Sequence, residues 1–352
     1  MWEYLKTTEK PIVLYGTGNG AEKILKRLDA LGIRVRGVFA SDDFVRGKVF
    51  CGMPVTSYAE AKAAFGDMIV LVCFGTDRPE VIGRIRQIAA EQELYMPDVP
   101  VVTEDDGSFE VFDGAYEAAH RAPLDAVFSA LSDEKSYKVL QSVIAYKKSG
   151  KIDDLFSCES PEEELWRLLG SGEHESYLDL GAYTGDTLAD FVRSVDGCYD
   201  HLYAMEPDAR NFRKLTENTI TYHDCELHNI AVSDHRETLQ FLKNSGRGSN
   251  RGGSAAGRSR VIDVPADSVD NILGGRPCSV IKFDVEGQEA KAIAGAAQTI
   301  RTQKPKLIVA AYHRTEDLFA VPLQILAVEP SYKVYLRHSP CLPAWEVNYV
   351  FV

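Results

Sequence analysis

Residues 177–187, with the sequence YLDLGAYTGDT, place two glycines between a strand-like and a helix-like stretch. The residues before Gly181 are mostly apolar, and Leu188 and Phe191, beyond Gly185, have helical spacing. Glycine reaches backbone angles that are closed to other residues and leaves no side chain between the main chain and a ligand. The segment therefore predicts a strand, a tight turn and a helix, against which a nucleoside-sized molecule can lie.

Two acidic residues accompany this turn. Asp179 lies at the end of the first predicted strand, and Glu206 ends the next predicted strand, 21 residues beyond Gly185. In open α/β sheets, ligands bind at the carboxyl ends of the strands, and an acid at the tip of the second strand holds a ribose diol. The spacing predicts that Glu206 binds the ribose of a nucleotide-like cofactor.

A second group of ionisable residues lies farther along the chain. Asp284 and Glu286 come at the end of a predicted strand over residues 278–284, and His313 ends the next predicted strand. Carboxylates and an imidazole at one edge of a sheet could position a hydroxyl group and remove its proton. We expect Asp284 or Glu286 to position the acceptor and His313 to take the proton. The alternatives are a helix cap at Glu286 and a purely structural His313.

The amino-terminal region contains another strand followed by a glycine turn, at residues 11–20, PIVLYGTGNG. Gly16 and Gly18 have dinucleotide-binding spacing, and Asp42, 24 residues after Gly18, is a candidate ribose ligand. Together with Gly20 they form a candidate second nucleotide site. A Rossmann-like scaffold that serves packing or partner recognition would produce the same pattern, so both alternatives stay open.

Residues 244–260, NSGRGSNRGGSAAGRSR, are rich in glycine, serine and arginine. Such a composition has too little apolar surface to order itself, and it predicts a loop. Arginine binds phosphate or carboxylate through paired hydrogen bonds, so Arg247 and Arg251 are candidate ligands of an anionic acceptor. A solvated hairpin tip is the alternative.

The length of the chain favours more than one domain. Its 352 residues exceed the usual size of a single core. We predict an α/β protein with a Rossmann-like domain over residues 1–122, a helical connector over 123–170 and a second α/β domain over 171–352. The last two predicted strands, 332–338 and 346–352, are close enough in sequence to pair antiparallel.

Composition narrows the classes of partner. A net charge of -13 argues against a nucleic-acid partner and favours small molecules. The seven cysteines are scattered and form no CxxC pair, which predicts reduced thiols and no metal site. The sequence has neither a signal-peptide pattern nor an apolar run long enough for a membrane span. These features predict a cytoplasmic protein that is not inserted in a membrane.

The motifs between residues 177 and 352 together resemble the FkbM-type S-adenosylmethionine-dependent methyltransferases. The resemblance rests on LDLGAYTGD at 178–186, AMEPD at 204–208, HNIAVSD at 228–234, IKFDVEGQE at 281–289, YH at 312–313 and YLRH at 335–338. The amino-terminal part resembles the Rossmann-like extension of some members. The resemblance implies a class I methyltransferase domain with a seven-strand sheet and S-adenosylmethionine as cofactor.

The resemblance also implies functional residues. The implied cofactor ligands are Asp179, Gly181, Ala182, Tyr183, Gly185, Asp186, Thr187, Glu206, Pro207, Asn229 and Ala231. Tyr312 and Arg337, from the last two motifs, join Arg247 and Arg251 as candidate acceptor ligands.

Methyl transfer is an in-line displacement at a sulfonium carbon, so the enzyme mainly aligns donor and acceptor and excludes water. We expect O-methylation of a hydroxyl on a sugar or another small hydroxylated metabolite. An NAD(P)- or nucleotide-sugar-binding oxidoreductase that uses Gly16, Gly18 and Asp42 is the alternative. As a third possibility, the amino-terminal domain recognises the acceptor or its carrier. The sequence leaves the acceptor and the oligomeric state open.

Overall fold

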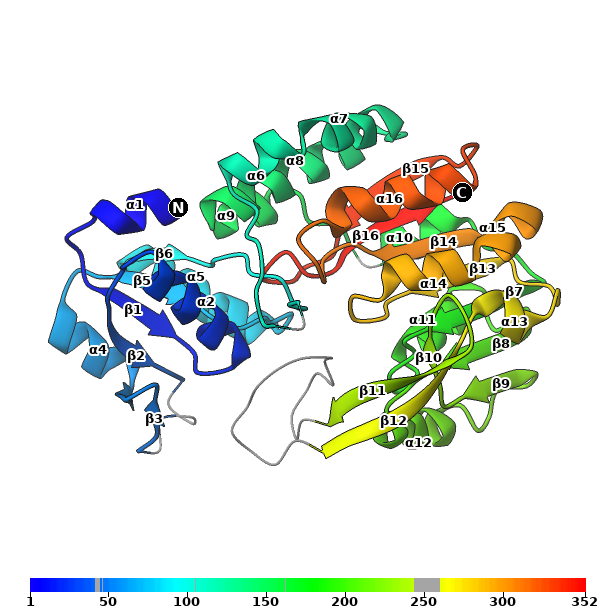
Figure 1. The fold of residues 1–352 in the computed structure, drawn as a ribbon, viewed down its shortest axis with the longest axis horizontal. Helices are drawn as coiled ribbons and strands as arrows, with labels where there is room; N and C mark the ends of the chain where they lie inside the picture. The colour runs from blue at the N-terminus through cyan, green and yellow to red at the C-terminus, as the bar shows by residue number, and fades with distance from the viewer. Residues whose placement is uncertain (42–44, 46, 105, 162, 244–259) are drawn as a thin grey trace.

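Two α/β units are joined by a row of helices in the computed structural model, which describes residues 1–41, 45, 47–104, 106–161, 163–243 and 260–352 (Figure 1). Three of the predicted site residues, Asp42, Arg247 and Arg251, lie outside these residues. The predicted α/β class with two Rossmann-like units is confirmed. No helix in the described ranges is both long and apolar enough to cross a membrane.

The amino-terminal sheet has six strands in the order β3-β4-β2-β1-β5-β6, and only β3 runs antiparallel to its neighbour. The central strands β1 and β5 are buried along their whole length, as expected for strands covered by helices on both faces. The strands are β1 (Ile12–Tyr15), β2 (Val35–Phe39), β3 (Val49–Phe50), β4 (Met53–Thr56), β5 (Ile69–Val72) and β6 (Glu93–Tyr95).

Helices cover both faces of this sheet. The buried side chains of α1 (Trp2–Thr7) and α2 (Asn19–Ala30) join one apolar cluster, and those of α4 (Tyr58–Phe65) and α5 (Pro79–Glu91) join another. Helix α4 begins with a capping box, in which Ser57 and Glu60 satisfy each other's backbone N–H groups.

Four of the connecting helices lie along the top of the molecule in Figure 1, namely α6 (Gly114–Ala119), α7 (Arg121–Ala130), α8 (Glu134–Ser149) and α9 (Ile152–Phe156). The fifth, α10 (Glu163–Leu169), packs against the second sheet. The sequence predicts that Gly150 ends the long helix, and Gly150 does so in the left-handed conformation with φ 66°. The Ser136 hydroxyl of α8 accepts a hydrogen bond of 2.9 Å from the Leu336 N–H, which attaches α8 to the edge of the second sheet.

The carboxyl-terminal sheet has seven strands in the order β15-β16-β14-β13-β7-β8-β9. All neighbours are parallel except β16, which runs antiparallel to both β14 and β15, as predicted. The strands are β7 (Glu175–Leu180), β8 (Tyr199–Met205), β9 (Cys225–His228), β13 (Val280–Phe283), β14 (Lys306–Ala310), β15 (Val334–His338) and β16 (Val347–Phe351).

Residues 226–232 do not form one continuous strand. Strand β9 ends at His228, and β10 (Ala231–Val232) belongs to a separate sheet with β11 (Glu237–Lys243) and β12 (Arg260–Asp267). Asn229 lies at the break, where its side-chain amide donates to the carbonyls of Glu206 (2.8 Å) and Pro207 (3.2 Å). This contact ties the break to the loop after β8.

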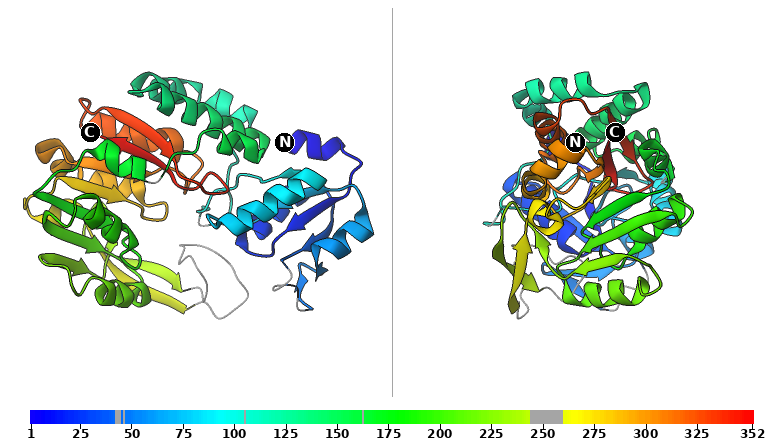
Figure 2. Two further views of the ribbon diagram at one scale, coloured as in Figure 1. Left: turned by 180° about the vertical axis from the view of Figure 1, so that it is seen from behind. Right: turned by 90° about the vertical axis from the view of Figure 1, so that its right-hand side faces the viewer.

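Helices pack on both faces of the seven-strand sheet, as the two views of Figure 2 show. Helices α10, α11 (Asp186–Ser194) and α12 (Ala209–Asn218) share one apolar cluster with the sheet. Buried residues of the helices on the other face join a larger cluster that continues through α8 into the amino-terminal sheet. The helices on that face are α13 (Val269–Leu273), α14 (Glu289–Gly295), α15 (Ala297–Gln303) and α16 (Asp317–Val328).

The two units also touch directly. Beyond β5, the backbone of Thr76 exchanges hydrogen bonds of 2.6 and 2.9 Å with Leu342, in the connection between β15 and β16. In the same place the Trp345 ring covers Gly75, where a Cβ atom would overlap it. Because β5 and β15 both end at this contact, the carboxyl ends of the two sheets meet each other. These are the edges where doubly wound sheets bind ligands.

Candidate active site

The glycine turn after β7 lies against the loop that follows β13. Gly181 has φ 88°, and a Cβ atom there would overlap the carbonyl oxygen of Asp284. Gly185 has φ 90° and precedes α11, and a Cβ atom there would come within 3.0 Å of Leu215. The sequence attributes these glycines to the need for ligand space, but protein packing alone already requires both. The turn and the loop with Asp284 form one continuous surface.

Glu206 lies at the centre of the predicted cofactor site. Its carboxylate accepts hydrogen bonds from the N–H groups of Tyr183 (2.9 Å) and Asp208 (2.8 Å). Burial nevertheless raises the pKa of Glu206 to about 7, and the two N–H donors only partly offset this effect. Tyr183 has φ 47° and is 46% exposed, so its side chain is available for contact with a ligand.

Asp179 is completely buried at the end of β7. One carboxylate oxygen accepts a hydrogen bond from the Thr187 hydroxyl, and the other has no hydrogen-bond partner within the described part of the chain. Burial raises the pKa of Asp179. Protein atoms cover this oxygen, so Asp179 supports the turn from inside and does not face a ligand in this conformation.

The other predicted cofactor residues lie on the loops around these acids. Ala182 is buried in the turn, Asp186 begins α11, Pro207 follows Glu206, and Ala231 begins β10. The Asn229 amide is occupied by the carbonyls of residues 206 and 207. The structure therefore brings the turn, the loop after β8 and Asn229 into direct contact.

Asp284 is held by three charged or polar neighbours. It accepts hydrogen bonds from the Lys282 ammonium (3.0 Å) and the Tyr312 hydroxyl (3.2 Å), and His313 Nε2 lies 3.5 Å away. Burial by itself would raise the pKa of Asp284, but Lys282 and His313 outweigh it and lower that pKa. Asp284 is therefore an ionised, fixed carboxylate and a weak base.

His313 is surrounded by carboxylates and is only 2% exposed. Its Nδ1 lies 2.9 Å from Glu289, and its Nε2 lies 3.8 Å from Glu286. Burial would lower the pKa of His313, but Glu289, Asp284 and Glu286 raise it to about 10. Such a pKa favours the imidazolium form at neutral pH and argues against the expected role of His313 as the acceptor of the substrate proton.

Glu286 is the accessible carboxylate of the group, with a side chain that is 57% exposed. Its φ is 53°, and Gly287 follows with φ 86°. A non-glycine residue in this region costs about 1–3 kcal/mol and often marks a functional site. Although the side chain is accessible, partial loss of solvation raises the pKa of Glu286, and His313 offsets part of this effect, so this carboxylate is a better base than Asp284. The alternative of a helix cap is not observed, since Gln288 caps α14.

Glu289 and Glu346 belong to the site but were not predicted. Glu289 is buried beside His313, and its carboxylate accepts a hydrogen bond of 3.0 Å from the Val285 N–H. Glu346 has φ 55°, and its charge helps to raise the pKa values of Lys282 and Tyr312. The end of the IKFDVEGQE motif could have indicated Glu289, whereas Glu346 is brought here only by the antiparallel strand β16.

Arg337 does not belong to the site, contrary to the prediction. The side chain is buried, and its guanidinium binds Asp133 (2.6 Å), Glu164 (2.6 Å) and the Ser136 hydroxyl (2.9 Å). All of its nitrogens donate within the protein. Arg337 therefore joins α8 and α10 to β15, and its buried guanidinium is engaged within the protein.

The amino-terminal glycine turn is packed differently. A Cβ atom at Gly16, which has φ 114°, would lie 2.7 Å from the Phe74 ring. A Cβ atom at Gly20 would overlap the Cys73 carbonyl oxygen, whereas Gly18 has open space around it. Packing against the end of β5 therefore explains two of the three glycines, and the Phe74 ring occupies the place beside Gly16.

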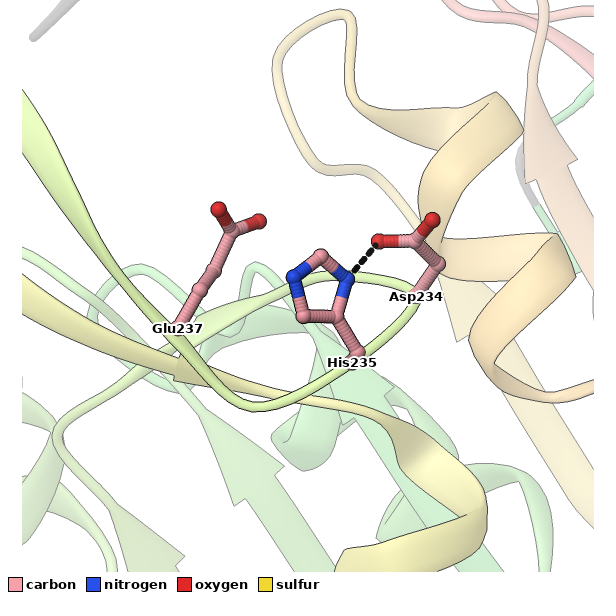
Figure 3. Close-up of side chains that lie close together, drawn as sticks. All are labelled: Asp234, His235 and Glu237. Atoms are coloured by element: carbon pink, nitrogen blue, oxygen red, sulfur yellow. Dashed lines mark hydrogen bonds and ion pairs between the residues drawn. The ribbon is translucent and has the colours of Figure 1, made fainter.

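Two groups of residues have the composition of a cation site. Asp284, Glu289 and His313 form the first, in which the His313 ring already contacts both carboxylates. Asp234, His235 and Glu237 form the second, on the turn between β10 and β11 (Figure 3). In this second group His235 Nδ1 lies 2.7 Å from Asp234, and the Lys291 ammonium lies 3.6 Å from Glu237. Both groups are thus held by cations or donors of the protein itself.

The seven-strand order with one antiparallel strand, and the acids at its carboxyl edge, have the arrangement of a Rossmann-like methyltransferase fold. Residues 179–333 match the family described as the methyltransferase FkbM domain. This match agrees with the resemblance predicted from the sequence.

Solved structures agree with this fold. The crystal structure of methyltransferase FkbM from Methylobacillus flagellatus KT aligns with a TM-score of 0.70 and 19% identity, covering 100% of this chain and 92% of that one. An rRNA methylase from Streptococcus thermophilus aligns with a TM-score of 0.36 and 12% identity over 55% of this chain and 95% of its own. The second score is too low to establish a shared fold. Among proteins with curated descriptions, none matches the chain.

Proposed function

We propose that this protein is an S-adenosylmethionine-dependent O-methyltransferase that acts on a hydroxyl of a sugar or another small hydroxylated metabolite. The contact between Gly181 and the Asp284 carbonyl carries the proposal. A methyl donor on the glycine turn would have the acids of the loop at 284–287 beside it. The same contact fixes the spacing between donor and acceptor sites, on which an in-line displacement depends.

The residues present fit the donor. Glu206 offers carboxylate oxygens at the tip of β8, where a ribose diol is bound in related sheets. Tyr183 exposes an aromatic ring beside the glycine turn. When bound, S-adenosylmethionine supplies an electrophilic methyl group on a positively charged sulfur.

Glu286 is the residue best suited to take the acceptor's proton. It is exposed, and its raised pKa brings its proton affinity closer to neutral pH than that of an ordinary glutamate. Asp284, fixed by Lys282 and Tyr312, would orient the hydroxyl. The His313 imidazolium lies 3.5 Å from Asp284 and 3.8 Å from Glu286, and its charge stabilises both carboxylates. Arg247 and Arg251 remain candidate ligands for an anionic acceptor, but they lie outside the described residues.

The oxidoreductase alternative has less support. The Phe74 ring lies next to Gly16. The carboxyl ends of the two sheets meet each other. This arrangement favours a role of the amino-terminal unit in binding the acceptor.

The first test is titration calorimetry of the full chain with S-adenosylmethionine. We expect binding that Glu206→Ala weakens at least tenfold, about 1.4 kcal/mol. Glu226→Ala is the matched control, because Glu226 lies on the neighbouring strand β9 in an ion pair with Arg276. Transfer of a radiolabelled methyl group to a panel of monosaccharides and their nucleoside-diphosphate derivatives then tests the acceptor class. Equal affinities in wild type and Glu206→Ala would contradict the proposed cofactor site.

A further inference from the structure

A short segment of the amino-terminal unit, residues 100–102, lies on the loop that carries Glu286. We call this segment the strap. On one side it is held by Lys23 of α2, whose ammonium donates to the carbonyls of Pro100 (2.9 Å) and Val101 (2.7 Å). The strap thus connects the helix after the amino-terminal glycine turn to the other unit.

On its other side the strap contacts two residues of the active site. The Val102 N–H donates to the His313 carbonyl at 3.0 Å. The Val102 side chain is buried against Gly287, where a Cβ atom would lie 2.7 Å from Val102 Cγ2. A side chain at position 287 is therefore excluded by the strap as well as by the positive φ of Gly287.

Arg314 completes the enclosure of Gly287. Its Nε donates to the Gly287 carbonyl at 3.0 Å, and its guanidinium lies 3.3 Å from Glu104, two residues beyond the strap. Thr315 also donates to the Glu110 carbonyl at 2.8 Å. The peptide after Glu286 is thus held between the strap and Arg314.

Glu286 has a backbone conformation that persists only where its surroundings enforce it, and the residue that follows it is enclosed by the strap. We propose that Val102 and Lys23 are positioning residues for methyl transfer, which hold the Glu286 carboxylate toward the acceptor through Gly287. The amino-terminal unit then takes part in the reaction without touching the cofactor. This inference rests on the proposed role of Glu286.

Lys23→Met tests the proposal, because it keeps an unbranched side chain and removes both hydrogen bonds to the strap. Lys26→Met is the matched control. Lys26 lies on the same helix and donates to the Gly107 carbonyl at 2.8 Å, in the same connecting segment but away from Gly287. Val102→Ala is a second variant in case Lys23→Met does not fold.

The first measurement is hydrogen exchange by mass spectrometry on the full chain. In Lys23→Met and Val102→Ala we expect exchange over residues 285–288 to be at least tenfold faster than in wild type and Lys26→Met. Exchange in β7 and β8 should stay unchanged, which separates loss of positioning from general destabilisation. Equal exchange at 285–288 in Lys23→Met, Val102→Ala and Lys26→Met would overturn the proposal.

The second measurement is total methyl transfer to the acceptor panel as a function of pH. Both strap variants should lower kcat at least fivefold and leave the affinity for S-adenosylmethionine within twofold of wild type. A released Glu286 becomes better solvated, so the rise of rate with pH should move to lower pH. An unchanged kcat would overturn the proposal. Failure of wild type to bind S-adenosylmethionine would refute the proposed function, whereas equal exchange with normal binding would refute only the role of the strap.

Discussion

The molecule contains two strand–glycine–helix turns that look alike in sequence but meet different neighbours. At Gly181 the strand end on one side, that of β13, supplies Asp284 and Glu286. The strand end on the other side, that of β8, supplies Glu206. At Gly16 the neighbouring strand end supplies the Phe74 ring. A glycine turn therefore provides a place for a ligand, and the adjacent strand ends decide whether that place contains acids or is filled by an apolar side chain.

The two turns also differ in their strained residues. Tyr183, Glu286 and Glu346, all at the carboxyl edge of the second sheet, have positive φ without being glycine. At the first turn, within the described residues, the positive φ belongs to Gly16 itself. A positive φ costs little at glycine, and at Gly16 it serves packing. At a residue with a functional side chain a positive φ costs energy, so the surrounding contacts have to maintain it.

The largest effect is expected from removing the acid that distinguishes the second turn. Glu286→Gln should lower kcat by about 10²–10⁴-fold because the acceptor's proton loses its base. The affinity for S-adenosylmethionine should stay within twofold of wild type, measured by calorimetry. Glu60→Gln, which alters an exposed capping carboxylate beside the first sheet, is the control and should keep full activity. A decrease of less than threefold for Glu286→Gln would show that another group takes the proton.

Adding a methyl group to each turn compares them directly. Gly181→Ala would overlap the Asp284 carbonyl and have an unfavourable φ, so we expect it to lower the free energy of unfolding by about 3 kcal/mol or more. Gly18→Ala meets open space and has φ -89°, so its effect should stay within about 0.5 kcal/mol. Chemical denaturation measures both. Similar losses in the two variants would remove the distinction between the turns.

The pH dependence of cofactor binding gives a smaller effect. Glu206 has a pKa raised to about 7, so it loses its charge as the pH falls through that value. If the ionised form accepts the ribose hydroxyls, affinity for S-adenosylmethionine should fall about tenfold from pH 8 to pH 6. Glu206→Gln should bind weakly and show little change over the same range. A wild-type affinity independent of pH would place the ribose elsewhere.

The smallest effect is expected at the first turn. NADH titrated into the full chain should give no heat beyond dilution, because the Phe74 ring occupies the space beside Gly16. Clear saturable binding, abolished by a bulky residue at Gly18, would restore the alternative of a dinucleotide site in the amino-terminal unit.

The sequence predicts most of the fold because strand periodicity and turn glycines are local signals. It also places Asp179, Glu206, Asp284 and Glu286 at one edge, since parallel strands end together. The differences concern properties that distant residues determine. Glu289 raises the pKa of His313, and the sequence does not show that the two residues, 24 positions apart, are in contact.

The same reason explains the other differences. Arg337 belongs to the YLRH motif at the end of β15, yet Asp133 and Glu164, both far away in sequence, occupy its guanidinium. Phe74 cannot be recognised as the neighbour of Gly16 without the pairing of β1 with β5. Protonation and packing are therefore the two features that required the tertiary structure.

The buried Arg337 has a practical consequence for anyone who wishes to prepare the catalytic half alone. A recombinant fragment starting at residue 171 would lack Asp133, Ser136 and Glu164, and it would expose Arg337 to water together with the apolar surface that α8 and α10 cover. Exposed apolar patches of this kind promote aggregation. A soluble, crystallisable fragment should therefore begin before Asp133 and keep the helices that neutralise this arginine.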